Sequence, residues 1–205
     1  MANVAVIYYS STGNVHRLAQ AAAESAEKAG AEVRLRRVAE LAPESVVAGT
    51  PAWAEHAAAT ADIAEASLAD LEWADVILFG TPTRFGLPAA QLKQFIDTTG
   101  GLWFQGKLVN KVVSSFVSTS TAHGGQESTV LALNNTFYHW GAIIVPPGFA
   151  DTVQFEPENG NPYGASSISG NNPANVAEAN LSAVEYQARR AVEIADALKR
   201  GFSAA

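Results

Sequence analysis

The sequence predicts a doubly wound parallel α/β sheet with helices on both faces, on three observations. Short apolar runs of strand length, rich in β-branched residues, recur along the chain. Segments with apolar residues at helical spacing alternate with these runs. Gly and Pro residues separate many of the segments. Five alternations of strand and helix are typical of a parallel sheet, and its crossover helices must lie on both faces.

Five segments are predicted as strands. They cover residues 4–9, 33–38, 76–79, 112–117 and 143–145. Continuous apolar runs of this length are typical of parallel strands that are buried on both faces. The second run carries Arg34, Arg36 and Arg37, so we expect it to be more exposed than the others.

Helices are predicted between and after these strands. The expected helices cover residues 15–30, 88–99, 127–138 and 176–200. Apolar residues at Val15, Leu18, Ala22 and Ala26 follow helical spacing, and Pro88 suits a first helical turn. Two segments break the alternation, residues 41–69 and 148–173. We expect both to be irregular insertions, which in compact domains are usually functional lids or interface loops.

Composition narrows the function classes. The chain has 205 residues, 13 Lys and Arg against 20 Asp and Glu, a net charge of −7 and no cysteine. The acidic balance disfavours nucleic-acid binding, which needs clustered Lys and Arg. The lack of cysteine excludes disulfides, thiolate metal sites and a cysteine nucleophile. His16, His56 and His123 lack metal-ligand spacing, so no metal is expected.

The organisation of the chain is expected to be simple. No repeat or linker divides it, so residues 1–205 are predicted to form one domain. The apolar runs are far shorter than the roughly 20 residues that a bilayer requires. The amino terminus lacks the basic region and apolar length of a signal peptide, so we expect a cytoplasmic protein.

Three loops are expected to meet at the carboxyl edge of the sheet, where open parallel sheets bind ligands. The first loop, residues 10–15 (SSTGNV), offers three hydroxyl groups before a helix amino terminus, which favours an anion such as phosphate. The same residue types also form ordinary helix N-caps, and that reading stays open. The loop matches neither GxxxxGK[ST] nor GxGxxG, which disfavours a Walker-type site and a tightly held dinucleotide.

The second and third loops favour a flat ligand. Residues 80–88 (GTPTRFGLP) place Arg84 beside an aromatic residue in a backbone stiffened by proline, although Arg84 also suits an intersubunit salt bridge. Residues 118–127 (STSTAHGGQE) are small enough to let backbone approach a ring closely, although such a segment also suits a flexible surface loop. A phosphate at the first loop and a flat ring between the other two describe flavin mononucleotide (FMN).

The sequence resembles the WrbA-like flavoproteins, which are type IV NAD(P)H:quinone oxidoreductases of flavodoxin-like fold. The resemblance spans nearly the whole chain in the order of the family. It is carried by YYSSTGN (8–14), FGTPTRFG (79–86), QFIDTTGGLW (94–103), FVSTSTAHGGQE (116–127), IIVPPG (143–148) and NPYGASSISG (161–170). It implies a five-stranded flavodoxin-like sheet in the order 2-1-3-4-5 and a homotetramer whose neighbouring subunits close the sites.

The resemblance also implies which residues hold FMN. The phosphate would be bound by Ser10, Ser11, Thr12, Gly13, Asn14 and Val15. The ring would lie between one set, Pro82, Thr83, Arg84, Phe85 and Gly86, and a second set, Ser118, Thr119, Ser120, Thr121, Ala122, Gly124 and Gly125. Trp103 and His139 would line the open face where nicotinamide and quinone bind, with Trp103 as a stacking wall and His139 as a hydrogen-bond or proton donor to quinone.

The chain departs from the family pattern at three places. Ser120 stands where the family commonly has glycine, Trp140 replaces a second histidine after His139, and Thr12 stands where some relatives carry an aromatic residue. The loop around Thr12 is closer to that of true flavodoxins.

The resemblance implies an FMN-dependent quinone reductase in which NAD(P)H and quinone use one pocket in turn, with ping-pong kinetics. Two other classes stay open. A flavodoxin-type electron carrier fits the acidic balance, although a carrier would not need Trp103, His139 and the insertions. A regulatory FMN protein without catalysis is the third class, and no sequence feature marks a surface for it.

Overall fold

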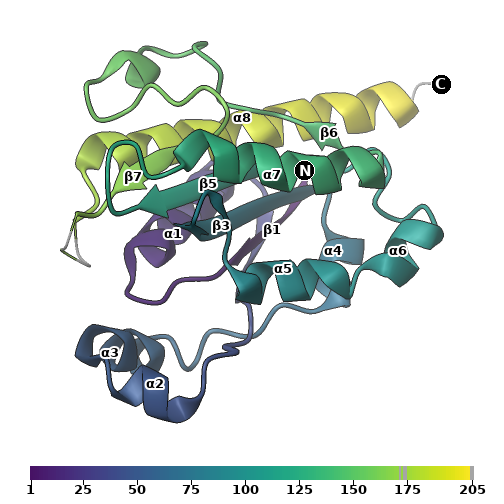
Figure 1. Ribbon diagram of the computed structural model, residues 1–205. Helices are drawn as coiled ribbons and strands as arrows, with labels where there is room; N and C mark the ends of the chain where they lie inside the picture. Colours follow the sequence, from purple (N-terminus) through teal and green to yellow (C-terminus); the bar gives the residue numbers. More distant parts are fainter. Residues whose placement is uncertain (171, 173–174, 204–205) are drawn as a thin grey trace.

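The parallel sheet is present with the expected strand order (Figure 1). The computed structural model describes residues 1–170, 172 and 175–203. Five parallel strands form the path β2-β1-β3-β5-β6, which confirms the predicted order 2-1-3-4-5. They are β1 (Asn3–Tyr8), β2 (Glu32–Arg37), β3 (Val76–Arg84), β5 (Val112–Thr119) and β6 (Ile143–Ile144).

Two short strands extend this sheet beyond the predicted five. β4 (Leu87–Pro88) pairs antiparallel with the end of β3, and β7 (Ser166–Ile168) pairs in parallel with the end of β5. Strands of two and three residues with Ser and Pro carry no apolar periodicity, so the sequence did not reveal them. Both pair with the carboxyl ends of the central strands and lengthen the sheet where the site lies.

Helices cover both faces of the sheet. α1 (Asn14–Lys28) and α8 (Glu178–Ser203) pack on one face, and α4 (Leu68–Trp73), α5 (Ala90–Asp97) and α7 (Gln126–Trp140) pack on the other. Successive strand side chains point to opposite faces. Val4, Val6 and Tyr8 of β1 therefore join the first core, whereas Ala5 and Ile7 join the second. This is the strand buried on both faces that the apolar run predicted.

The insertions are more regular than expected. Within residues 41–69 the chain forms α2 (Glu44–Ala48) and α3 (Pro51–Ala59), which Figure 1 shows set apart from the sheet layers. The expectation of an irregular segment was wrong here because alanine favours helix and Pro51 occupies the first helical turn instead of breaking one. A 3₁₀ helix, η1 (Thr152–Phe155), lies in the second insertion, and α6 (Gly100–Phe104) follows α5.

Gly80 tests how closely the central strands pack. A Cβ atom built on Gly80 would lie 2.4 Å from the ring of Phe116 on β5. We therefore expect Gly80→Ala to lower the free energy of unfolding by about 1–3 kcal/mol, as overpacking does. Denaturant unfolding followed by circular dichroism measures this. The matched control is Gly101→Ala in α6, where an added Cβ meets nothing within 4 Å. An equal loss in both variants would contradict the argument.

Candidate functional site

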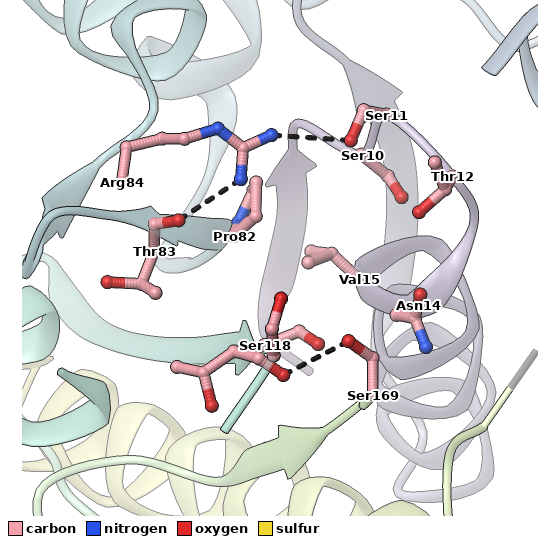
Figure 2. A pocket seen from close by; sticks show the side chains of 12 residues that line it. Ser10, Ser11, Thr12, Asn14, Val15, Pro82, Thr83, Arg84, Ser118 and Ser169 are labelled. Carbon is pink, nitrogen blue, oxygen red and sulfur yellow. Dashed lines mark hydrogen bonds between the residues drawn. The ribbon is translucent and has the colours of Figure 1, made fainter. Parts of the chain in front are cut away.

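The three loops meet in one pocket at the carboxyl ends of β1, β3 and β5 (Figure 2). The pocket has a volume of about 180 Å³ and a polar lining. Loop one follows β1. The second segment is less of a loop than expected, because β3 continues to Arg84 and Leu87–Pro88 form β4, which leaves only residues 85 and 86 as the turn. The third segment runs from the end of β5 to the start of α7. The lining residues are Ser10, Ser11, Thr12, Asn14, Val15, Pro82, Thr83, Arg84, Ser118, Thr119, Ser120 and Ser169.

The first loop presents the amino end of α1 to this pocket. Gly13 is the N-cap residue with φ of 102°, a left-handed conformation that favours glycine, and it supplies no side-chain cap. Its own N–H donates to Ser10 Oγ at 3.0 Å. The first-turn N–H groups of a helix have no partner within the helix, and the helix dipole favours an anion near them. Together with the hydroxyls of Ser10, Ser11 and Thr12, this donor set fits a phosphate group without a cation in the loop.

Arg84 connects the first two loops across the pocket mouth. Its Nη2 donates to Ser11 Oγ at 3.3 Å and its Nη1 to the carbonyl of Thr83 at 3.1 Å. The Thr83 hydroxyl in turn lies 2.5 Å from Thr129 Oγ1 on α7. The guanidinium is thereby placed at the rim, where it supplies the only positive charge among the lining residues.

The second and third loops touch through two glycines. A Cβ atom built on Gly125 would lie 2.8 Å from the Cα of Gly86. Gly125 also has φ of 96° as the N-cap of α7. The close contact with Gly86 and the positive φ both favour glycine at position 125. The backbones of the second and third loops therefore lie in direct contact. Ser169 follows β7 at the far wall, and its hydroxyl donates to the Thr119 carbonyl at 3.1 Å.

Not every predicted cofactor residue lines the pocket. Gly13, Phe85, Gly86, Thr121, Ala122, Gly124 and Gly125 belong to its loops but not to its lining. Phe85 is fully exposed, with a left-handed φ of 54°. In the single chain its ring therefore points away from the core as an unpartnered apolar group.

Trp103 and His139 lie elsewhere in the chain. They line a separate depression between α6 and the end of α7, with Trp103 Nε1 donating to the His139 carbonyl at 2.8 Å. Helices rise about 1.5 Å per residue, so His139 lies roughly 20 Å along α7 from Gln126 beside the pocket. Figure 1 shows α6 at the opposite end of the sheet from β7. A single chain does not bring these two residues to the loops.

Two features of the site were missed by sequence reasoning. Ser169 lies within a motif quoted for the family resemblance, but its place in the pocket depends on the pairing of β7 with β5. Glu40 is the second. Its carboxylate accepts hydrogen bonds from Tyr9, Gln91 and Trp53 at 2.8, 2.7 and 3.2 Å, and from the N–H groups of residues 41 and 42. Glu40 thereby attaches α3 to the residue before loop one and to α5.

These contacts alter the acidity of Glu40. Partial burial raises the pKa of its carboxyl, but the hydrogen bonds outweigh burial and hold the pKa below its usual value. Burial and the hydrogen bond to Glu40 raise the pKa of Tyr9. Tyr9 therefore remains a neutral donor and Glu40 a charged acceptor across the neutral pH range.

Two further features of the described residues concern metal-binding clusters and helices that could span a membrane. Within residues 1–170, 172 and 175–203, no three His, Cys, Asp or Glu side chains gather as a metal site. In the same part of the chain, no helix has the length and apolar character needed to span a bilayer. Trp140, which stands where the family has a second histidine, is buried beside Phe79 and Phe137.

Solved structures place the chain among flavodoxin-like proteins. A WrbA-like flavodoxin from Agrobacterium tumefaciens is 23% identical, with a TM-score of 0.66 over 96% of this chain and 98% of that one. A flavodoxin from the domain Archaea is 14% identical, with a TM-score of 0.61 over 95% and 99% of the two chains. At these identities the likeness shows the fold.

The family follows from sequence. The model of the NADPH-dependent FMN reductase family matches residues 2–155, and the chain belongs to this family. An NAD(P)H dehydrogenase (quinone) from Deinococcus radiodurans is 47% identical over 93% of this chain and 94% of its own length. A protein of the same name from Aromatoleum aromaticum is 44% identical over 98% and 99% of the two chains. The resemblance drawn from the motifs is confirmed.

Glu40 yields a prediction on stability. We expect Glu40→Gln to lower the free energy of unfolding at pH 7 by about 1–2 kcal/mol, since it weakens several charge-assisted hydrogen bonds at a partly exposed site. A carboxyl whose folded pKa is depressed adds stability above its unfolded pKa and loses it as pH falls. The difference between wild type and variant should therefore shrink as pH falls below about 4.

Urea unfolding of both proteins between pH 7 and pH 3 measures this difference. The control is Glu27→Gln at an exposed position of α1, which should change stability little. A difference for Glu40→Gln that stays constant down to pH 3 would show that its charge does not matter.

Proposed function

We propose that the protein is an FMN-dependent NAD(P)H:quinone oxidoreductase that reduces quinones to hydroquinones. Membership of the FMN reductase family and the names of relatives sharing 44–47% of its residues support this. The observation that carries the proposal is the polar pocket at the switch point between β1 and β3, with the amino end of α1 opening into it. Ligands of doubly wound sheets bind at this point.

The loops divide the binding of FMN between them. Residues 10–15 hold the phosphate through backbone N–H groups and hydroxyls. Residues 82–86 and 118–125 flank the ring, with Arg84 placing positive charge at its edge. Bound FMN would supply the two-electron chemistry, in which the quinone gains a hydride equivalent from NAD(P)H and one proton. We expect both substrates to use one pocket in turn, with ping-pong kinetics.

A homotetramer supplies the rest of the site. The cavity of one chain, about 180 Å³, is smaller than the roughly 300–1,000 Å³ of ligand pockets. Trp103, Phe104 and Tyr138 are 50%, 85% and 68% exposed at the far end of the sheet, an apolar surface that suits an interface. We place Trp103 and His139 of a neighbouring subunit over the open side of the pocket. There Trp103 forms a stacking wall and His139 donates a hydrogen bond or proton to the quinone oxygen.

The proposal extends to the organisation of the chain. Residues 1–205 form one FMN-binding domain, of which residues 171, 173–174 and 204–205 lie outside the described part. We place the protein in the cytoplasm, where NADH and NADPH are available to it.

The first test is a spectrum and an assay. The purified protein should show flavin absorption and reduce benzoquinone with NADH or NADPH. The Ser10→Ala, Thr12→Ala double variant should bind FMN at least about tenfold more weakly, since each hydroxyl bond to a charged group contributes about 1.5–3 kcal/mol. Quenching of FMN fluorescence measures the affinity.

The control is the Ser45→Ala, Thr50→Ala double variant, which removes the same hydroxyls from exposed positions around α2. Bound flavin without steady-state turnover with either donor would favour the electron carrier. Unchanged FMN affinity in the Ser10 and Thr12 variant would place the phosphate elsewhere.

The shared site is tested by complementation. His139→Ala should lower quinone reduction but leave FMN affinity intact, and the Ser10→Ala, Thr12→Ala variant should lack FMN at low flavin concentration. Co-refolding the two variants should restore part of the activity, because mixed oligomers contain a site with both intact halves. Mixtures with no more activity than the two variants measured apart would show that each chain builds its site alone.

A further inference from the structure

A second cavity lies on the outer side of the first loop. It has a volume of about 370 Å³, twice that of the loop pocket, which is within the range of about 300–1,000 Å³ for ligand sites. One wall is the start of α1 with His16 and Arg17, and the other is the face of α3 that carries Glu55, His56 and Ala59. Thr12 lines both cavities, so the second lies next to the first at the first loop.

The walls of this cavity are held in place. The Tyr8 hydroxyl lies 2.7 Å from His16 Nδ1, and the rings of His16 and His56 lie 5.4 Å apart with a tilt of 54°. Burial, and then the neighbouring His56, lower the pKa of His16 to about 4. Burial also lowers the pKa of His56, opposed by a hydrogen bond with the Ser10 backbone. At neutral pH both rings are therefore uncharged aromatic surfaces.

The opposite wall is fixed by Glu40. Trp53 of α3 donates to Glu40 Oε2 at 3.2 Å, and the same carboxylate binds Tyr9 and Gln91. Trp53 also packs against the second core of the domain. Its packing and its hydrogen bond to Glu40 together hold α3 at the edge of the cavity. The cavity is thus bounded on two sides by anchored elements.

The lining has the chemistry of a nucleoside site. Two uncharged imidazole rings offer faces on which a planar base can stack, and Ala52 and Ala59 leave room for it. Arg17 adds positive charge suited to phosphates. The Glu55 carboxylate is an acceptor for ribose hydroxyl groups, the role of an acidic residue in dinucleotide sites.

The position of the cavity beside the first loop indicates which nucleoside it could bind. FMN is a mononucleotide, so its phosphate ends at the first loop. A nicotinamide dinucleotide that stacks on the same ring and runs in the same direction has one more nucleotide to place beyond that loop. We propose that this second cavity binds the adenosine half of NAD(P)H. This inference rests on the proposed function, since it assigns the part of the donor that the loop pocket does not hold.

Filling the cavity tests the proposal. Ala59→Leu narrows it from an exposed position on α3, and Ala58→Leu makes the same change on the same helix outside the cavity lining. The measurement is the ratio of kcat/KM for NADH to that for reduced nicotinamide mononucleotide, which lacks the adenosine half, with FMN-loaded protein. Ala59→Leu should lower this ratio about tenfold or more, the scale of a lost pocket contact, and Ala58→Leu should not. An unchanged ratio in Ala59→Leu overturns the proposal.

A binding measurement separates this proposal from catalysis. Adenosine diphosphate ribose, which is the dinucleotide without its nicotinamide base, is titrated into the FMN-loaded protein by calorimetry. We expect binding to wild type and Ala58→Leu, and at least about tenfold weaker binding to Ala59→Leu. Equal affinity in all three proteins overturns the assignment. A change of oligomeric state in Ala59→Leu also overturns it, because the cavity would then be an interface between subunits. Failure of NADH and NADPH to reduce the flavin contradicts the proposed function, whereas this titration tests the cavity alone.

Discussion

The place of β3 between β1 and β5 is the constraint on which the site depends. Parallel pairing sets Tyr8 opposite Gly80 and Pro82 opposite Ser118, so all three loops start from one edge within a few residues of register. This close spacing needs Gly80, since any side chain there meets the Phe116 ring. The backbone contact between Gly86 and Gly125 then fixes loops two and three against each other. The pocket is therefore a result of packing at the centre of the sheet.

The same arrangement bears on the proposal that an acidic chain binds the FMN phosphate at this edge of the sheet. With a net charge of −7 and no Lys or Arg in loop one, attraction between net charges cannot supply the affinity. In the proposed site, oriented dipoles take this role: the first-turn N–H groups of α1 and the hydroxyls beside them. Such donors are effective only when their geometry is fixed. Glu40 serves this purpose from outside the pocket, because it fastens Tyr9, the residue before the loop.

The sequence predicted those features of the fold that depend on a local pattern of residues. The apolar run of β1 and the helical spacing after Val15 gave the layers, and Ser10 to Val15 was placed at the correct edge. Contacts between residues that are far apart in the sequence leave no such pattern, so they were not predicted. Ser169 reaches the pocket through a three-residue strand, and His56 meets His16 because Glu40 holds α3 in place. Trp103 and His139 match the pattern of the family. A sequence pattern does not show whether such residues lie at the pocket of their own chain or, as proposed, at that of a neighbouring subunit.

The topology of the chain supports the proposal of an assembly that shares sites. α7 starts beside the pocket at Gln126 and carries His139 in its last turn, so nearly its whole length separates the two halves of the proposed site. α7 connects β5 to β6 in the sequence, and these two strands are paired in the sheet. While this pairing lasts, one chain cannot bring His139 to its own loop pocket. A two-fold axis that sets the α6–α7 end of one copy against the loops of another makes the reciprocal contact at the same time. One such interface therefore completes two sites, and the exposed Phe85 and Phe104 lie at the two surfaces that it would bury.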